Sequence, residues 1–173
     1  MASRINNLKR HDLIIDAIQH DILKNFYIKA YFAGDGENIN FLKSKIFKKN
    51  IFKFSGILEF KKLKKWYNSL DLYIQATTGE GHSTSILQAM GMNLPVLGSN
   101  VSGVNNFLIP PKKIGIIFNN DIKSLAKKIR YFAKMNDNKK DKIIKAQKNY
   151  ILNNYSEIKF LNEYKKIIKK LIL

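Results

Sequence analysis

The chain has no cysteine, only three prolines and far fewer acidic than basic residues among its 173 positions. Without cysteine, the sequence excludes disulfides, thiolate nucleophiles and cysteine-based zinc sites, and it suits the cytoplasm. No run of about 18 apolar residues is present, so no membrane span is expected. A content of 45% hydrophobic and 25% charged residues is typical of one globular domain rather than a disordered chain.

The shortage of acids leaves a formal net charge of +18. Basic chains attract polyanions, which include nucleic acid, anionic lipid and phosphorylated substrates. The lysines are scattered among Asn and Ile, so a bias in amino-acid usage explains the charge equally well, and only a selected surface predicts clustering on one face. We expect no nucleic-acid partner, because no zinc-finger spacing, aromatic RNA-binding motif or basic heptad region accompanies the charge.

Short apolar segments that end in small or polar turns alternate with segments of helical periodicity. The expected strands are 28–33, 51–54, 72–75, 95–98 and 114–118; the expected helices are 12–18, 63–70, 85–92 and most of 121–173, with breaks near 136–138 and 153–154. This order predicts an α/β fold with a Rossmann-like parallel sheet and helices on both faces. Such a sheet normally opens with a full central strand, and here only its last residues precede a helix. We therefore expect the first central strand to be largely missing and the chain to be a fragment.

The segment 80–91 carries the chemistry. It leaves a strand, turns through small residues and begins a helix, whose free N–H groups and positive dipole end suit a phosphate. Gly81 would let the backbone approach a ligand, and the Glu80 carboxylate could bind sugar hydroxyls. Gln88 lies on the helix, where its amide could reach the same crevice.

Each of these residues also has a purely structural interpretation. Ser85 and Gln88 have the spacing of a capping box, in which Gln88 would only complete its own helix end. Glu80 could be a solvated loop acid, Gly81 could serve only the turn, and a histidine such as His82 is more often a surface or capping residue than a catalytic one.

The order of these residues resembles a known family. Residues 77–99, TTGEGHSTSILQAMGMNLPVLGS, resemble the signature of the group 1 glycosyltransferases, retaining enzymes of family four with the GT-B fold. Glu80 matches the first acid of that signature, and Gln88 stands where the second acid would be. Arg4 and Lys9 resemble the opening motif of the family's donor-binding domain, and 34–36, 54–56, 101–104 and 115–118 follow in the family's order.

This resemblance implies that residues 1–173 form the C-terminal, nucleotide-sugar-binding domain, with the N-terminal acceptor domain absent from the chain. Glu80 would contact the donor sugar, Arg4 and Lys9 would hold the diphosphate, and Gln88 would bind the ribose. Two cations and a helix N-terminus could stabilise a departing nucleoside diphosphate without a metal. The residues expected to bind the nucleotide sugar are Gly56, Ile57, Leu58, Gly81, His82, Ser83, Thr84, Ser85 and Gln88.

The expected function is sugar transfer, with retention, from a nucleoside-diphosphate sugar to a bacterial glycan or lipid-linked acceptor. No cofactor and no metal are expected. Gln88 in place of an acid leaves open a catalytically inactive nucleotide-sugar-binding domain, and the isolated chain should not transfer sugar. An anionic membrane surface is a further candidate partner, because 164–172 alternates basic and apolar pairs at helical spacing; packing of that helix on the domain is the alternative. The expected location is the cytoplasm or the inner face of the membrane.

Overall fold

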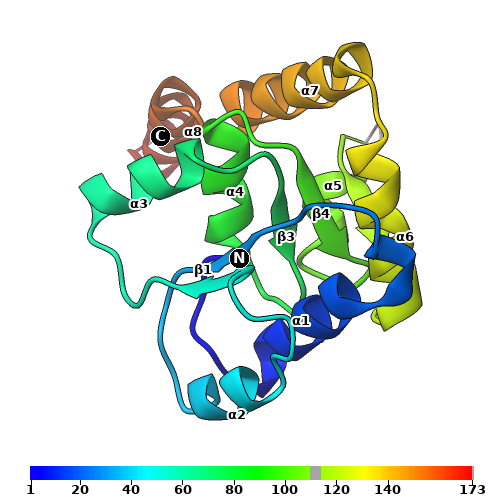
Figure 1. The fold of residues 1–173 in the computed structure, drawn as a ribbon. Coiled ribbons are helices and arrows are strands. Elements are labelled where there is room, and N and C mark those ends of the chain that lie inside the picture. The colour runs from blue at the N-terminus through cyan, green and yellow to red at the C-terminus, as the bar shows by residue number, and fades with distance from the viewer. Residues whose placement is uncertain (110–113, 173) are drawn as a thin grey trace.

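The computed structural model describes residues 1–109 and 114–172 (Figure 1). The helices are α1 His11–Gln19, α2 Ile39–Ser44, α3 Phe60–Asn68, α4 Thr84–Gly91, α5 Asn105–Leu108, α6 Ile122–Ala133, α7 Asp137–Tyr155 and α8 Glu157–Ile172. The strands are β1 Ala30–Phe32, β2 Phe52–Phe54, β3 Tyr73–Gln75, β4 Val96–Ser99 and β5 Ile116–Phe118, and two 3-10 turns lie at Asn7–Lys9 and Asp21–Leu23. Every expected strand is present, and α2 and α5 are short helices that the sequence pattern did not predict.

The strands are parallel and form two sheets, β1-β2 and β3-β4-β5. Between them lies only the start of the chain, where Ala2 forms one parallel bridge with Ala33. Parallel strands flanked by helices confirm the predicted fold class, and this single bridge agrees with a first central strand of which little is present. The sheet is consequently divided where that strand would lie.

Both faces of the larger sheet are buried. In β4, Val96 packs into the cluster formed with α3, α4 and α5, whereas its neighbour Leu97 packs into the cluster formed with α1 and α6. Successive side chains of a strand point to opposite faces, so a strand without a polar face requires cover on both sides. This accounts for the continuous apolar run at 94–97 and leaves the strand ends as the accessible part of the sheet.

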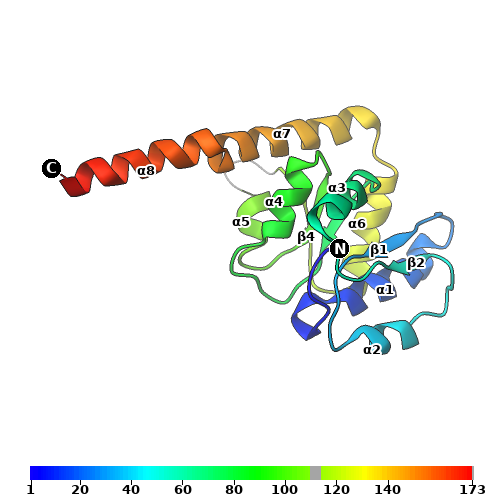
Figure 2. The same cartoon turned by 90° about the vertical axis from the view of Figure 1, so that its left-hand side faces the viewer.

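Capping residues set where the two C-terminal helices, α7 and α8, begin and end. Asn136 accepts a hydrogen bond from the Lys139 N–H and begins α7, as the expected break near 136–138 indicated. The second break was predicted too early: Asn154 stays helical, with its side-chain amide donating to the Tyr150 carbonyl, and the chain leaves the helix at Ser156. Beyond it, α8 projects from the body of the domain (Figure 2).

Candidate functional site

The loops that follow the strands are tied together at the carboxyl edge of the larger sheet. The Thr77 N–H donates to Ser99 Oγ (3.0 Å), and the Asn120 side-chain amide donates to the Thr77 carbonyl (2.7 Å). Thr77 Oγ1 donates to the Leu8 carbonyl (2.9 Å), which attaches the 3-10 turn near the N-terminus to the same place. Residues distant in sequence therefore converge at the edge where ligands of such sheets bind.

Lys9 and Glu80 meet at this edge. The Lys9 ammonium donates to Glu80 Oε2, and the two side chains are 19% and 13% exposed. A second contact fixes the loop beside them, because the Thr78 N–H donates to the Leu8 carbonyl (3.0 Å). The structure thus brings together two of the three predicted catalytic residues as a largely buried ion pair.

Arg4, the third, lies apart from that pair. Its guanidinium is 3.8 Å from Glu37, and its side chain is 75% exposed. The segment that carries Arg4 is held by the turn after β1: a Cβ on Gly34 would lie 2.0 Å from the Ser3 carbonyl oxygen, and the φ of Gly34 is +128°. Glycine is required here by close approach and by backbone conformation together.

A second glycine supports Glu80 itself. Gly103 has a φ of +76°, and a Cβ there would lie 1.7 Å from the Glu80 carbonyl oxygen. The turn after β4 therefore packs directly against the backbone of the Glu80 loop. The sequence indicated a turn at 101–104 but not this contact, because the two segments are more than 20 residues apart and no local pattern relates them.

The start of α4 faces the same loop. Ser83 is the N-cap residue, is buried, and makes no capping hydrogen bond with its side chain. The Thr84 N–H donates to the His82 carbonyl (3.2 Å), whereas the Ser85 N–H has no backbone acceptor within the described parts of the chain. The helix therefore offers unpaired donor capacity at its first turn, as the sequence predicted.

The capping-box interpretation of Ser85 and Gln88 is wrong. Ser85 lies inside α4, and its hydroxyl donates to Gln75 Oε1 (3.3 Å). Gln88 is exposed, and its Oε1 accepts from the buried Tyr67 hydroxyl (3.2 Å). Burial raises the pKa of Tyr67, so this hydroxyl stays protonated and remains a donor.

A buried polar network joins the N-terminus of the chain to α4. The Tyr73 hydroxyl contacts the Ala2 N–H and carbonyl (both 3.2 Å) and Gln75 Oε1 (2.9 Å), and Gln75 in turn contacts Ser85. Burial raises the pKa of Tyr73 to about 12, which keeps its hydroxyl neutral. Sequence analysis treated Tyr73 and Gln75 only as strand residues; the polar Gln75 in an apolar strand was the available signal.

The remaining predicted residues surround these elements. The exposed His82 packs its ring edge-on against the buried Phe107, with centroids 4.9 Å apart. Gly56 has a φ of +65°, and its carbonyl accepts from the Gly34 N–H (2.7 Å), so the segment 56–58 starts beside the turn that supports Arg4. Ile57 then extends into solvent with 83% of its surface exposed.

The arrangement offers a cation paired with a carboxylate, the first turn of a helix and an exposed apolar side chain along one edge. The cation and the helix start can bind phosphate oxygens, the carboxylate can accept hydrogen bonds from sugar hydroxyls, and the apolar side chain can cover a base. Across residues 1–109 and 114–172 there is no cluster of three or more His, Asp or Glu side chains that could hold a metal ion.

A family model described as "Glycosyl transferases group 1" matches residues 1–134. The chain belongs to the group 1 glycosyltransferases. Protein CapJ of Staphylococcus aureus is 30% identical over an alignment of 186 positions, which covers 100% of this chain and 46% of that protein. The UDP-N-acetylglucosamine--peptide N-acetylglucosaminyltransferase GtfA subunit of Limosilactobacillus reuteri is 29% identical over 118 residues, which cover 67% of this chain and 23% of that protein.

Solved structures agree on the fold. A glycosyltransferase from Rickettsia africae matches 99% of this chain and 47% of its own with a TM-score of 0.84 at 23% identity. Anabaena Alr3699/HepE in complex with UDP and glucose matches 97% of this chain and 47% of its own with a TM-score of 0.82 at 18% identity. The chain thus has the architecture of one half of a GT-B fold and spans less than half the length of these relatives.

Proposed function

We propose that this chain supplies the donor site of a retaining glycosyltransferase that uses a nucleoside-diphosphate sugar. The observation that carries the proposal is the Lys9–Glu80 ion pair, which lies among the loops at the carboxyl edge of the larger sheet. The ammonium can be shared between Glu80 and a diphosphate, while the carboxylate accepts hydrogen bonds from sugar hydroxyls. The Arg4 side chain is 75% exposed and would turn from Glu37 to the phosphates.

The nucleotide would lie along the edge from the first turn of α4 towards 56–58. In this arrangement the Ser85 N–H donates to a phosphate oxygen, Gln88 forms hydrogen bonds with the ribose hydroxyls, and Ile57 covers one side of the base. The Tyr67 hydroxyl donates to Gln88 Oε1, and this hydrogen bond holds the Gln88 side chain in position. Uracil is the base we propose, since structures of similar fold from Anabaena and Staphylococcus aureus contain UDP.

The alternative of a catalytically inactive nucleotide-sugar-binding domain rests only on Gln88, which stands where the family signature has an acid. A Gln amide still donates and accepts hydrogen bonds to a diol, although more weakly than a charged acceptor does. We therefore place the chain in an active enzyme whose acceptor-binding half lies outside residues 1–173. The acceptor that we propose is a bacterial surface glycan or its lipid-linked precursor.

Titration with UDP-, GDP-, ADP- and CMP-sugars tests the donor proposal. We expect a UDP-sugar to bind most tightly, and Glu80→Gln to weaken its binding at least tenfold while binding of UDP itself changes by less than threefold, because the sugar alone contacts Glu80. Glu59→Gln is the matched control, since Glu59 is an exposed acid next to α3. Equal loss of UDP and UDP-sugar affinity in Glu80→Gln would contradict the assigned role.

The surface of α8 supports a membrane-associated location for the full enzyme. Its apolar side chains are exposed, with Ile158 at 73%, Phe160 at 67% and Ile167 at 56%. These side chains are therefore not packed on the domain, which was the alternative to a membrane contact. Lysines flank that apolar stripe, including Lys159 and Lys166. An amphipathic basic helix of this kind suits an anionic lipid surface. No helix in the described residues is long and apolar enough to cross a membrane.

A further inference from the structure

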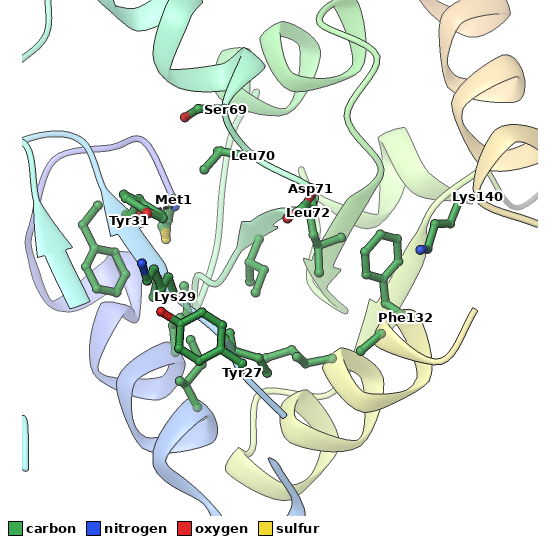
Figure 3. A pocket seen from close by; sticks show the side chains of 18 residues that line it. Met1, Tyr27, Lys29, Tyr31, Ser69, Leu70, Asp71, Leu72, Phe132 and Lys140 are labelled. Carbon is green, nitrogen blue, oxygen red and sulfur yellow. Dashed lines mark hydrogen bonds between the residues drawn. The ribbon is translucent and has the colours of Figure 1, made fainter. Parts of the chain in front are cut away.

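The structure contains a larger apolar cavity and a smaller polar one. The larger, of about 460 Å³, separates β1 from β3 and has an apolar base formed by α1 and α6 (Figure 3). It belongs to the division of the sheet described above. The smaller, of about 340 Å³, lies between the 3-10 turn Asn7–Lys9, the start of α1 and α2, and its lining is mostly polar. None of its lining residues has a role in the donor site proposed above.

The polar cavity adjoins the residues assigned to the donor's diphosphate. Asn7 and Arg10 in its lining stand on either side of Lys9 in the sequence. On the opposite wall, Asn38 follows the acid that pairs with Arg4. A ligand in this cavity would therefore lie beside the donor site without occupying it.

Hydrogen bonds hold the two walls of the cavity together. The Ile5 N–H donates to the Asp35 carbonyl (2.9 Å), and the Asn38 N–H donates to the Ile5 carbonyl (3.4 Å). The Asn38 side-chain amide also donates to Asn7 Oδ1 (2.6 Å), which joins the walls a second time. The cavity is therefore largely preformed, as small-molecule sites usually are.

Amide side chains in the lining keep free hydrogen-bonding capacity. The contact between Asn38 and Asn7 leaves Asn7 Nδ2 and Asn38 Oδ1 without a partner among the described residues. Asn6 Oδ1 accepts from the Lys9 N–H (3.2 Å), while Asn6 Nδ2 donates to no group in the same parts of the chain. The cavity thus presents free donors and a free acceptor on neutral groups.

Arg10 and Asp12 form a bidentate ion pair in the same lining. Arg10 Nε and Nη2 donate to the Asp12 carboxylate at 3.0–3.2 Å, and the two side chains are 29% and 27% exposed. Burial opposes ionisation of Asp12, but the Arg10 guanidinium holds the pKa of that carboxyl below its usual value. The pair is neutral as a whole, yet Arg10 Nη1 and the carboxylate oxygens can still bond hydroxyl groups.

An aromatic ring and a buried imidazole complete the lining. Phe41 of α2 is 56% exposed, whereas His11 is 1% exposed. His11 Nε2 lies 3.3 Å from Ser3 Oγ, but Nδ1 has no hydrogen-bond partner within residues 1–109 and 114–172. Its contact with the Lys9 backbone does not reach hydrogen-bond geometry at that nitrogen. A ligand hydroxyl would supply a partner that the chain itself does not.

These groups together select one class of ligand. A phosphate would meet a cation already neutralised by Asp12, and an apolar ligand would leave the amides unpaired. A neutral ring with several hydroxyls would pair with them, and its apolar face would pack on Phe41. The volume is at the lower end of the range for small-molecule sites, about 300–1,000 Å³, so one small ring suits it better than a long chain.

We propose that this cavity binds one sugar ring of the acceptor glycan. Asn7 and Asp12 would bond its hydroxyls, and Phe41 would cover its apolar face. The donor's sugar is a different ring, because Glu80, which is assigned to it, does not line this cavity. The choice of an acceptor ring rests on the function proposed above, whereas the sugar-binding chemistry rests on the cavity alone.

NMR titration of the full chain with methyl glycosides of glucose, galactose and N-acetylglucosamine tests the site. We expect at least one glycoside to shift the side-chain amide signals of Asn7 and Asn38 saturably. Phe41→Ala should weaken this binding about fivefold or more, whereas Phe41→Tyr, which keeps the ring, should change it by less than about twofold. Phe47→Ala is the matched control, since Phe47 is also exposed but lies outside the lining, and its effect should be equally small. Asn7→Ala should weaken binding several-fold through the lost amide.

Repeating the titration with a saturating UDP-sugar distinguishes the acceptor ring from the donor's sugar. We expect the affinity for the glycoside not to fall, because the two ligands occupy different places. Competition between them would mean that the cavity takes the donor's sugar and would overturn the proposal. The absence of a saturable shift with every glycoside, or equal binding by Phe41→Ala and the unmodified chain, would also overturn it. A chain that binds glycosides but no UDP-sugar would reject the proposed function and leave a sugar site standing.

Discussion

At the residue scale, the Lys9–Glu80 ion pair should contribute to stability as well as to binding. Both side chains are less than one-fifth exposed, so their interaction is screened less than that of a surface pair. A double-mutant cycle with Lys9→Met and Glu80→Gln, measured by urea unfolding, should give a coupling of about 1–3 kcal/mol. The exposed pair Lys159–Glu163 is the matched control and should give a clearly smaller coupling, because solvent screens it. Equal couplings would contradict the largely buried geometry.

The buried amino group of Met1 predicts how stability depends on pH. Burial lowers its pKa from 8.0 to about 5, so the unfolded chain binds more protons between these values and stability should rise with pH. The full effect is at most about 4 kcal/mol. Burial also lowers the pKa of His11 from 6.5 to about 3, which adds a rise in the same direction below pH 6.5. Urea unfolding from pH 6.5 to 8 therefore isolates Met1, and acetylation of its nitrogen should flatten the curve.

Gly103 provides a test of how the Glu80 loop is positioned. Gly103→Ala would place a Cβ against the Glu80 backbone at a positive φ, so we expect a loss of about 2–4 kcal/mol in unfolding free energy. Gly79→Ala is the control within the same loop, because nothing lies within 4 Å of a Cβ there. Its unfolding free energy should change by less than about 1 kcal/mol. A similar effect of both substitutions would show that the contact does not hold the loop.

At the scale of elements, α8 should mediate binding to anionic vesicles. Sedimentation with phosphatidylglycerol vesicles should retain the chain, whereas neutral phosphatidylcholine vesicles should not, and Ile158→Asp with Phe160→Asp should release it by removing apolar contact and adding negative charge. The control Lys142→Asp with Lys145→Asp changes the net charge by twice as much on α7. If the control releases the chain as fully as the α8 variant does, general charge rather than α8 causes the binding.

Sequence patterns located the buried strands well and the short helices poorly. Apolar segments at 72–75 and 95–98 predicted β3 and β4 to within one or two residues, because a strand buried on both faces has few polar positions. The short helices α2 and α5 lack a full periodic face, so no pattern marked them. The break at Ser156 was misplaced because Asn154, which often ends helices, instead bonds its own helix.

At the scale of the whole molecule, the site is divided between two sheets. The family signature indicated Lys9 and Glu80 as parts of one site, and the structure brings them into contact. It could not indicate the Tyr73–Gln75–Ser85 network or the contact of Gly103 with Glu80, because both arise from packing between distant segments. Arg4 is paired with Glu37 in the structure, and its role at a diphosphate stays a prediction.

The most direct test of a diphosphate site is the difference in affinity between UDP and UMP. We predict that UDP binds the chain at least tenfold more tightly than UMP, and that Arg4→Ala and Lys9→Ala each reduce this ratio several-fold while UMP binding is nearly unchanged. Arg130→Ala, which removes an exposed cation from α6, should leave the ratio intact. Equal affinities for UDP and UMP in the unmodified chain, or an unchanged ratio in both site variants, would contradict the account.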